Sequence, residues 1–304
     1  MMAGRRPGWT RLDAHLLRRW PLPRVAEDAD KEDRGRVLVV AGSREIPGAA
    51  LLAGIAALRA GAGKLVVATA QSVAQPLALA LPEARVIALP ETDRGSLAPS
   101  AVELLADSAR HTQAALLGPG LMDESGTCRF MEGLLPLLAH APVVLDALAM
   151  DIVRQVSRFD QPLLLTPHAG EMAHLLGQRK EDILAEPQRA ARDAARGWNA
   201  VVALKGATTL IATPEGTCWC HEGGHPGLAT SGSGDVLAGL IAGFAARQAP
   251  LEQACAWGVV LHAQAGAALA RRLGPLGFLA RELAAEIPPL VSRLQRRSAA
   301  SRGG

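Results

Sequence analysis

The sequence predicts a layered α/β fold in which helices cover both faces of a mostly parallel sheet. Short apolar runs recur along the chain and are continuous rather than alternating in polarity, as in parallel strands that are buried on both faces. Alanine-rich segments with helical spacing separate these runs. The 304 residues are 49% hydrophobic and 20% charged, which is a globular composition with enough length for a large core. We therefore expect a single domain over residues 1–304.

Six apolar runs are the predicted strands of this sheet. In chain order they are centred on Val37, Val66, Leu116, Val144, Leu164 and Val202. The clearest helices span residues 48–61, 181–198 and 251–274, and several of them are closed by a Gly or Pro. Residues 208–220 depart from this alternation, because TTLIATPEGTCWC has the pattern of two strands around a Pro-Glu-Gly turn. We expect a β-hairpin appended to the parallel sheet.

Composition and charge argue against several classes of protein. The chain has no Tyr, 3% aromatic residues and a net charge of +3, so we expect no nucleic-acid partner. Four irregularly spaced cysteines favour a reducing compartment, and no run is apolar for long enough to span a bilayer. The expected location is the cytoplasm. The basic ends are interpreted as solvated tails rather than contact arms, around an ordered core at about residues 30–295.

The stretch CWCHEGGH contains possible zinc ligands, namely Cys218, Cys220, His221 and His225. On a strand, the two cysteines would point to one face and His221 to the other. The spacing also matches none of the usual structural zinc patterns. We expect no bound metal in this stretch.

The strongest functional signal is GLATSGSGDVLAG, where a turn rich in Gly and Ser leads into an apolar helix beginning near Val236. The amides of Gly232, Ser233 and Gly234 would face an anion at the positive end of the helix dipole, so the turn is predicted to be an anion hole for a phosphate. A carboxylate at Asp235 is useful there if it removes a proton from a hydroxyl that attacks the phosphate. The alternative is that these residues only cap the helix.

Several stretches, taken in order, resemble one family over nearly the whole chain. They are GRVLVVAGSREIPGAALLAGIAALRAGAGKLVVAT, LLGPGL, LLLTPHAGEMAHLLG, VVALKGATTLIA, GLATSGSGDVLAG, LHAQAGAALA and GFLARELAAEIPPLV. The family is the ribokinase-like NAD(P)H-hydrate dehydratases, which restore hydrated nicotinamide coenzymes with ADP or ATP. The sugar and vitamin kinases of the same superfamily do not normally combine TPHAGE with GSGD. The resemblance implies a ribokinase-like αβα fold.

The chain departs from the family pattern at three places. Ser231 stands where the family usually has Gly, and its small side chain should still fit the turn. The run DALAM, from Asp146 to Met150, has one carboxylate where the family often has two. Thr208 replaces the usual Gly in KGATT, which would slightly reshape the nucleotide site.

The resemblance also implies roles for individual residues, with Asp235 as the catalytic base. The nicotinamide substrate would be bound by Ala49, Gly120, His168 and Asp235, and the nucleotide by Lys205, Gly206, Ala207, Thr208, Thr209 and Gly234. His168 follows an expected strand, at the edge where open α/β sheets bind ligands. A surface histidine satisfied by backbone groups is the alternative. Lys205 would reach a phosphate or pair with an acid such as Glu171.

The implied reaction is the dehydration of the S epimer of hydrated NADH or NADPH, which restores NAD(P)H. ADP is the favoured cosubstrate over ATP and would be converted into AMP and phosphate. The resemblance further implies Mg²⁺ as cofactor, a homo-oligomer such as a tetramer, and an epimerase on a separate chain. Two alternatives stay open from the sequence. A small-molecule alcohol kinase of the same superfamily would use the same turn and base, and a nucleotide-sensing relative would keep the site without the chemistry.

Overall fold

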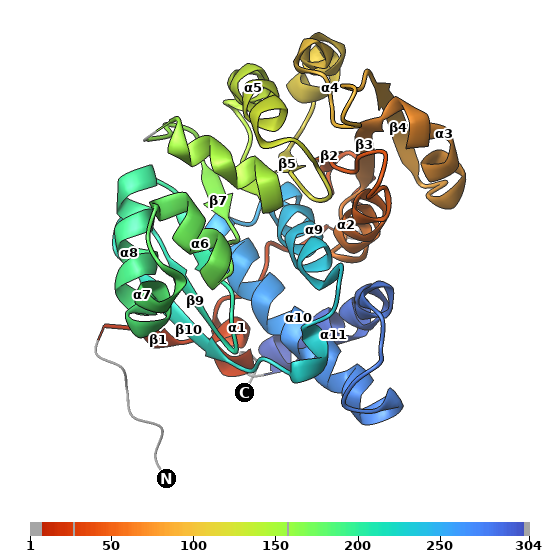
Figure 1. Cartoon of the computed structure of the whole chain (residues 1–304). Helices are drawn as coiled ribbons and strands as arrows, with labels where there is room; N and C mark the ends of the chain where they lie inside the picture. Colours follow the sequence, from red (N-terminus) through yellow and green to blue (C-terminus); the bar gives the residue numbers. More distant parts are fainter. Residues whose placement is uncertain (1–7, 27, 157, 301–304) are drawn as a thin grey trace.

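The chain folds into a sheet with helices on both faces (Figure 1). The computed structural model describes residues 8–26, 28–156 and 158–300, and in this part the sheet has ten strands. They are β1 (Thr10–Arg11), β2 (Arg36–Val40), β3 (Lys64–Ala70), β4 (Ala84–Leu89), β5 (Ala114–Leu117), β6 (Val143–Leu145), β7 (Leu163–Leu165), β8 (Val201–Leu204), β9 (Thr208–Ala212) and β10 (Cys218–Glu222). Their order across the sheet is β1-β10-β9-β8-β7-β6-β5-β2-β3-β4.

The sheet is parallel from β4 across to β8, which confirms the predicted α/β architecture. The strands β9 and β10 pair antiparallel with each other, and β9 pairs antiparallel with β8. The hairpin expected from the Pro-Glu-Gly turn is therefore present at one side of the sheet. Because the parallel strands all end at the same edge, residues that follow different strands in sequence are brought together there.

Helices form a layer on each face of the sheet. The α-helices are α1 (Ala14–Arg19), α2 (Gly48–Arg59), α3 (Gln71–Ala80), α4 (Ala106–Arg110), α5 (Glu124–Leu134), α6 (Ala169–Leu176), α7 (Lys180–Ala185), α8 (Pro187–Trp198), α9 (Ser233–Ala246), α10 (Leu251–Leu273) and α11 (Ala280–Ala300). Four 3₁₀ helices complete the described part: η1 (Pro99–Leu105), η2 (Leu135–Leu138), η3 (Ala147–Arg154) and η4 (Pro226–Leu228). None of the helices in this part is long and apolar enough to cross a membrane.

The strand β2 explains why the apolar runs are continuous. Successive side chains of a strand point to opposite faces. Val37 and Val39 belong to the core cluster beneath α2, α9, α10 and α11, whereas Leu38 and Val40 belong to the cluster beneath α5, α6 and α8. Both faces are covered, so no position of the strand favours a polar residue.

The helix α9, which carries the glycine-rich turn at its start, packs closely on α2 (Figure 1). A Cβ atom at Gly239 would lie 2.2 Å from the carbonyl oxygen of Ala53, and one at Gly243 would lie 2.4 Å from that of Ala57. The two glycines, one helical turn apart, let the backbones of α2 and α9 touch. This packing fixes where α9 begins relative to the end of the sheet.

The structure differs from the sequence prediction near the start of the described chain and in one helix. The core was expected to begin near residue 30, but β1 pairs with β10, and Leu12 and Leu17 are buried. The expected helix over residues 181–198 is two helices, because Pro187 lacks an amide hydrogen and begins α8 at its first position. The outermost parts of the predicted basic tails, residues 1–7 and 301–304, lie outside the described residues.

Candidate active site

Most of the predicted site residues lie where the parallel strands end and α9 begins (Figure 1). Gly120 follows β5, His168 follows β7 and Lys205 follows β8. An isolated bridge joins His168 to Lys205, and the Lys205 amide donates to the Pro167 carbonyl at 2.7 Å. Strand order alone therefore brings together segments that are far apart in sequence.

The glycine-rich turn ends in an open helix N-terminus. Gly232 is the N-cap residue of α9 with φ of 85°, and a Cβ there would lie 2.4 Å from Cδ1 of Leu52. Only glycine meets both demands. No side chain caps α9, and the first helical hydrogen bond runs from the Val236 amide to the Gly232 carbonyl. The Ser233 amide donates to the Thr230 carbonyl at 3.2 Å, while the amides of Gly234 and the following residue have no partner within the helix.

The ammonium group of Lys205 forms the centre of a charged cluster. It lies 3.0 Å from Oδ1 of Asp146 and 3.8 Å from Oε2 of Glu171. Burial alone would lower the pKa of Lys205, but these two carboxylates outweigh it and hold the pKa above its ordinary value. A Cβ at Gly234 would lie 3.6 Å from the same nitrogen. Lys205 is therefore a fixed positive charge beside the start of α9.

Asp235 lies in the first turn of α9, within the field of this cluster. Burial and the negative charge of Asp146 raise its pKa, the charge of Lys205 lowers it, and together they place the pKa at about 6. A carboxyl group with a pKa near neutrality is suited to take a proton from a substrate. The helix-cap alternative is weakened, because the N-cap position belongs to Gly232 and no side-chain hydrogen bond is made there.

His168 uses one ring nitrogen structurally and leaves the other available. It is the N-cap of α6, where its Nδ1 accepts hydrogen bonds from the amides of Gly170 and Glu171 at 3.0 and 3.1 Å. Oε2 of Glu171 accepts a hydrogen bond from the His168 amide in return. Because Nδ1 acts as an acceptor, the neutral ring carries its proton on Nε2, and the side chain is 58% exposed. Nε2 lies 3.6 Å from Oε1 of Glu171 and is exposed enough for a ligand to reach it.

The turns after β2 and β5 meet each other. The Gly42 amide donates to the Pro119 carbonyl at 2.8 Å. Gly120 has φ of 67°, and a Cβ there would lie 2.7 Å from Cβ of Ala49. The structure thus brings Ala49 and Gly120 together, although Ala49 is 3% exposed and offers little surface to a ligand.

The segment predicted to hold the nucleotide, residues 205–209, links β8 to β9. Gly206 and Ala207 are exposed, while Thr208 and Thr209 are partly exposed at the start of β9. The Ala207 carbonyl accepts a hydrogen bond from the Gly224 amide at 3.3 Å, which ties this link to the loop after β10. The segment therefore offers open backbone and hydroxyl groups next to the turn at Gly234.

Asp146 and His262 received no role from the sequence, although both contact residues of the site. Asp146 is buried after β6 and accepts a hydrogen bond from the Thr166 hydroxyl at 2.6 Å. His262 lies in α10, with Nε2 3.1 Å from Oγ of Ser233 and 3.0 Å from its carbonyl oxygen. Burial lowers the pKa of His262 to about 4, so it is neutral. The only sequence signals were a lone Asp after a strand and a lone His in an apolar helix.

The possible zinc ligands Cys218, His221 and His225 of CWCHEGGH have separate protein partners. Cys218 Sγ accepts a hydrogen bond from Nε of Arg192 at 3.3 Å. His221 Nδ1 lies 2.8 Å from the Leu12 carbonyl oxygen, and His225 Nδ1 accepts from the Gly227 amide at 3.1 Å. Cys220 shares the buried face of Cys218. The absence of zinc from this stretch stays a prediction.

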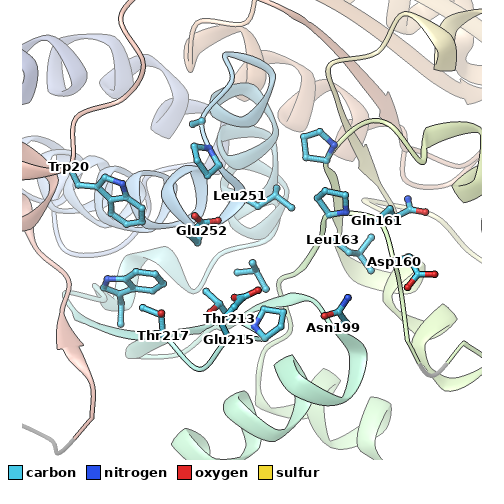
Figure 2. Close-up of a pocket in the computed structure, with 17 residues that line it drawn as sticks. Trp20, Asp160, Gln161, Leu163, Asn199, Thr213, Glu215, Thr217, Leu251 and Glu252 are labelled. Atoms are coloured by element: carbon cyan, nitrogen blue, oxygen red, sulfur yellow. The ribbon is translucent and has the colours of Figure 1, made fainter.

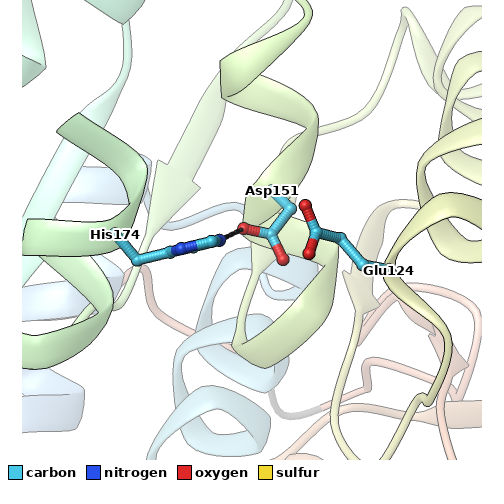
Figure 3. Close-up of side chains that lie close together, drawn as sticks. All are labelled: Glu124, Asp151 and His174. Atoms are coloured by element: carbon cyan, nitrogen blue, oxygen red, sulfur yellow. Dashed lines mark ion pairs between the residues drawn. The ribbon is translucent and has the colours of Figure 1, made fainter. Parts of the chain in front are cut away.

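Another group of polar side chains joins α5, η3 and α6 (Figure 3). His174 Nε2 lies 2.8 Å from Oδ1 of Asp151, and ligand atoms of Glu124 lie within 4.8 Å of both residues. The guanidinium of Arg154 lies 2.9 Å from Glu124 and 3.2 Å from His174 Nε2. Since Arg154 pairs with Glu124 and His174 pairs with Asp151, we interpret the group as an ion-pair network rather than a metal site.

The fold and the site together define an α/β protein with an uncapped helix N-terminus, which is suited to bind an anion, beside a lysine and a carboxyl group of raised pKa. A family model described as NAD(P)H-hydrate dehydratase matches residues 37–289. The chain belongs to this family.

Two curated relatives illustrate the similarity. The chain is 49% identical over 284 residues to an ADP-dependent (S)-NAD(P)H-hydrate dehydratase of Xanthomonas campestris, covering 93% of this chain and 96% of the relative. It is 39% identical over 278 residues to a bifunctional NAD(P)H-hydrate repair enzyme of Moorella thermoacetica, covering 90% of this chain. The match covers 52% of that relative, so this chain spans about half the length of the bifunctional enzyme.

Two solved structures have the same fold. An ADP/ATP-dependent NAD(P)H-hydrate dehydratase from Bacillus subtilis, co-crystallized with ATP/Mg²⁺, has a TM-score of 0.81 and 29% identity, covering 95% of this chain and 100% of that chain. A ribokinase-like superfamily protein from Enterococcus faecalis has a TM-score of 0.83 and 26% identity, covering 97% and 100%. The predicted ribokinase-like fold is confirmed.

Proposed function

We propose that this chain is a nucleotide-dependent dehydratase of the S epimer of hydrated NADH or NADPH, with ADP as the favoured cosubstrate. The observation that carries the proposal is the carboxyl group of Asp235, whose pKa is raised to about 6 by burial beside an open helix N-terminus. The names of the Xanthomonas campestris and Bacillus subtilis relatives support the substrate and the nucleotide.

The first chemical step is a phosphoryl transfer. Asp235 takes the proton from the C6 hydroxyl of the hydrated nicotinamide ring, and the hydroxyl oxygen attacks the terminal phosphorus of ADP. AMP leaves with the electron pair of the broken P–O bond. The Gly234 amide and the positive end of α9 stabilise the charge on the transferred group, together with the anion-hole residues Gly232 and Ser233.

The second step is an elimination that restores the coenzyme. The ring nitrogen donates its electron pair, the C6–O bond breaks, and phosphate leaves. Loss of a proton from the neighbouring C5 then gives the reduced nicotinamide. The net change is removal of water from the hydrate coupled to conversion of ADP into AMP and phosphate, so the reaction is that of a hydro-lyase although its first half is a kinase step.

The surrounding residues bind and orient the two substrates. Lys205 supplies the fixed positive charge that attracts the nucleotide phosphates, and the backbone from Gly206 to Thr209 holds the rest of the nucleotide. His168 donates from Nε2 to the nicotinamide substrate, and Gly120 offers its backbone to the substrate beside Ala49, which is largely buried.

Magnesium fits this group of residues. Asp146 and Glu171 carry carboxylate oxygens beside Lys205, and carboxylate oxygen is the donor chemistry that Mg²⁺ prefers alongside nucleotide phosphates. The ion would neutralise phosphate charge during the transfer. Co-crystallization of the Bacillus subtilis relative with ATP/Mg²⁺ supports the same cofactor.

We extend the proposal to the cellular setting. The S epimer alone is consumed, so a separate epimerase chain supplies it from the R epimer, a partition that the bifunctional Moorella thermoacetica enzyme suggests. A cytoplasmic location and a homo-oligomer, such as a tetramer, complete the proposal.

The decisive experiment is incubation of hydrated NADPH with the protein, Mg²⁺ and either ADP or ATP. The proposal expects the near-ultraviolet absorbance of reduced nicotinamide to reappear with stoichiometric release of phosphate, faster with ADP. Accumulation of a phosphorylated alcohol without recovered absorbance would identify a kinase. Nucleotide binding without turnover of any hydrate would identify a sensing protein.

A further inference from the structure

A cavity of about 740 Å³ opens at the end of the sheet opposite to Asp235 (Figure 2). Pro142 and Pro162 line it immediately before β6 and β7, and Val201 lines it at the start of β8. The strand β8 then runs to Lys205, about 13 Å away at the usual rise of a strand. The cavity therefore belongs to neither of the two substrate sites proposed above.

An aromatic pair forms one wall of this cavity. The rings of Trp20 and Trp219 are stacked, with centroids 5.4 Å apart and planes 21° apart. Both indoles are partly exposed. Figure 2 shows Trp20 on one side of the cavity and Gln161 on the other. Indole faces that remain open beside a cavity are favourable surfaces for cations.

The charge of the lining residues has one sign. Asp160, Glu215 and Glu252 line the cavity, and none of its lining residues is Lys, Arg or His. Glu252 is partly buried in the first turn of α10, where the helix dipole also favours a carboxylate. In Figure 2 its carboxylate lies on the same side as Trp20. Since the whole chain has a net charge of +3, this acidic wall contrasts with the protein around it.

Two polar atoms in the wall are buried and have no hydrogen-bond partner among the described residues. They are Oγ1 of Thr213 and Nε2 of Gln161. Thr213 is 5% exposed, so bulk water does not solvate its side chain. Proteins seldom leave buried polar atoms unpartnered, because the lost hydration is not replaced. The wall of the cavity therefore contains an amide and a hydroxyl group whose hydrogen-bonding capacity is unused in the described part of the chain.

We propose that this cavity binds a small organic cation, with an ammonium or aromatic cationic group held between the Trp20–Trp219 wall and the carboxylate of Glu252. Trp is the best aromatic partner for a cation, and the partly buried carboxylate of Glu252 completes the recognition. The acidic wall repels phosphates, so the cavity is not a second site for the nucleotide or the coenzyme. The volume is that of a small-molecule site and leaves room for an apolar body on Leu163 and Leu251.

Calorimetric titration of the full-length protein with choline and with 3,3-dimethyl-1-butanol tests this proposal, because the two molecules share one shape and differ in charge. Benzyltrimethylammonium adds an aromatic body to the same cationic group. We expect saturable binding of the two cations, tighter for benzyltrimethylammonium, and at least tenfold weaker binding of the neutral alcohol. Equal binding of choline and the alcohol would overturn the proposal, as would affinities weaker than about 10 mM for both cations.

Variants locate the binding. Glu252→Gln keeps the size of the side chain and should weaken benzyltrimethylammonium binding about tenfold, whereas Glu83→Gln, an exposed acid in the turn before β4, should leave it unchanged. Trp219→Leu should also weaken binding, and Trp219→Phe should retain most of it. If Glu252→Gln lowers the thermal midpoint, Glu215→Gln in the hairpin turn serves instead. Binding that none of these cavity variants changes would contradict the assignment.

Discussion

The ammonium nitrogen of Lys205 lies 3.0 Å from Oδ1 of Asp146, and this pair lies next to the turn that carries Asp235. Asp146 raises the pKa of Asp235, while Lys205 lowers it. Neither member of the pair needs to touch a substrate to influence the reaction. Their balance sets the pH at which the Asp235 carboxyl group becomes a base.

Asp146→Asn should therefore move the pH dependence of the reaction. Without the negative charge of Asp146, the pKa of Asp235 falls, so the acidic limb of kcat/KM against pH shifts to lower pH. The maximal rate should fall as well, because Lys205 loses its nearest counterion. Rate measurements across the acidic range test this, with Asp107→Asn at an exposed position as control. An unshifted limb in Asp146→Asn would show that the pair does not act on the base.

The free energy of unfolding should depend on pH through two buried groups, Asp235 and His262, whose protonation has opposite effects on stability. The pKa of Asp235 is raised to about 6 from 3.8, so this group stabilises the folded state as the pH falls through 6. The pKa of His262 is lowered to about 4 from 6.5, so this group destabilises the folded state as the pH falls from 6.5 toward 4. Each shift corresponds to roughly 3 kcal/mol.

The variant Asp235→Asn removes the stabilising contribution of Asp235 at acidic pH and leaves the destabilising contribution of His262. Its free energy of unfolding should therefore fall more steeply between pH 6.5 and 4 than that of the unmodified protein. At pH 8 the variant should be the more stable of the two, because it no longer buries a charged carboxylate. Urea titrations at a series of pH values test both statements. Parallel pH curves would be inconsistent with the raised pKa.

Gly239→Ala should destabilise the fold by roughly 1–3 kcal/mol through overpacking. The new methyl group would lie 2.2 Å from the Ala53 carbonyl oxygen, so α9 would have to move away from α2. Gly197→Ala in α8 is the matched control, since nothing lies within 4 Å of the added atom. That control should be neutral or stabilising, because alanine is the better helix former. Equal urea midpoints for the two variants would contradict this account of the helix contact.

Thr208→Gly should change nucleotide affinity only mildly. The position is partly exposed at the start of β9, and the proposed contacts of this segment are largely with its backbone. Titration with AMP or ADP measures the effect. A loss of more than about tenfold, or ~1.4 kcal/mol, would mean that the Thr208 side chain makes a specific contact.

The strands of the sheet could be predicted where a continuous apolar run in the sequence coincides with burial of both faces of the strand. The runs around Val37 and Val202 are apolar on both faces because helices cover both faces, and the Pro-Glu-Gly turn specifies the hairpin. The edge strands β1 and β4 were missed. β1 has two exposed residues, and β4 has a mixed pattern of burial, so neither has the continuous apolar run used to find the others.

The sequence predicts the backbone turns of the site better than the charged groups that act on Asp235. Glycines at positions such as Gly232 are visible in sequence because the turn requires them. The influence of Asp146 and His262 is not visible, because it depends on distances between β6, α10 and α9 that no local pattern encodes. A single Asp or His has many possible partners until the fold selects one.

The central claim is that Asp235 is the base of the reaction, and one variant tests it most directly. Asp235→Asn keeps the size of the side chain and the open helix N-terminus but removes the proton acceptor. ADP affinity should be retained or slightly increased, because a negative charge near the phosphates is lost. The rate of dehydration of hydrated NADPH should fall by roughly a hundred- to ten-thousandfold. A near-normal rate in this variant, with ADP still bound, would contradict the mechanism, because a residue that only supports the start of the helix can be replaced by Asn at little cost.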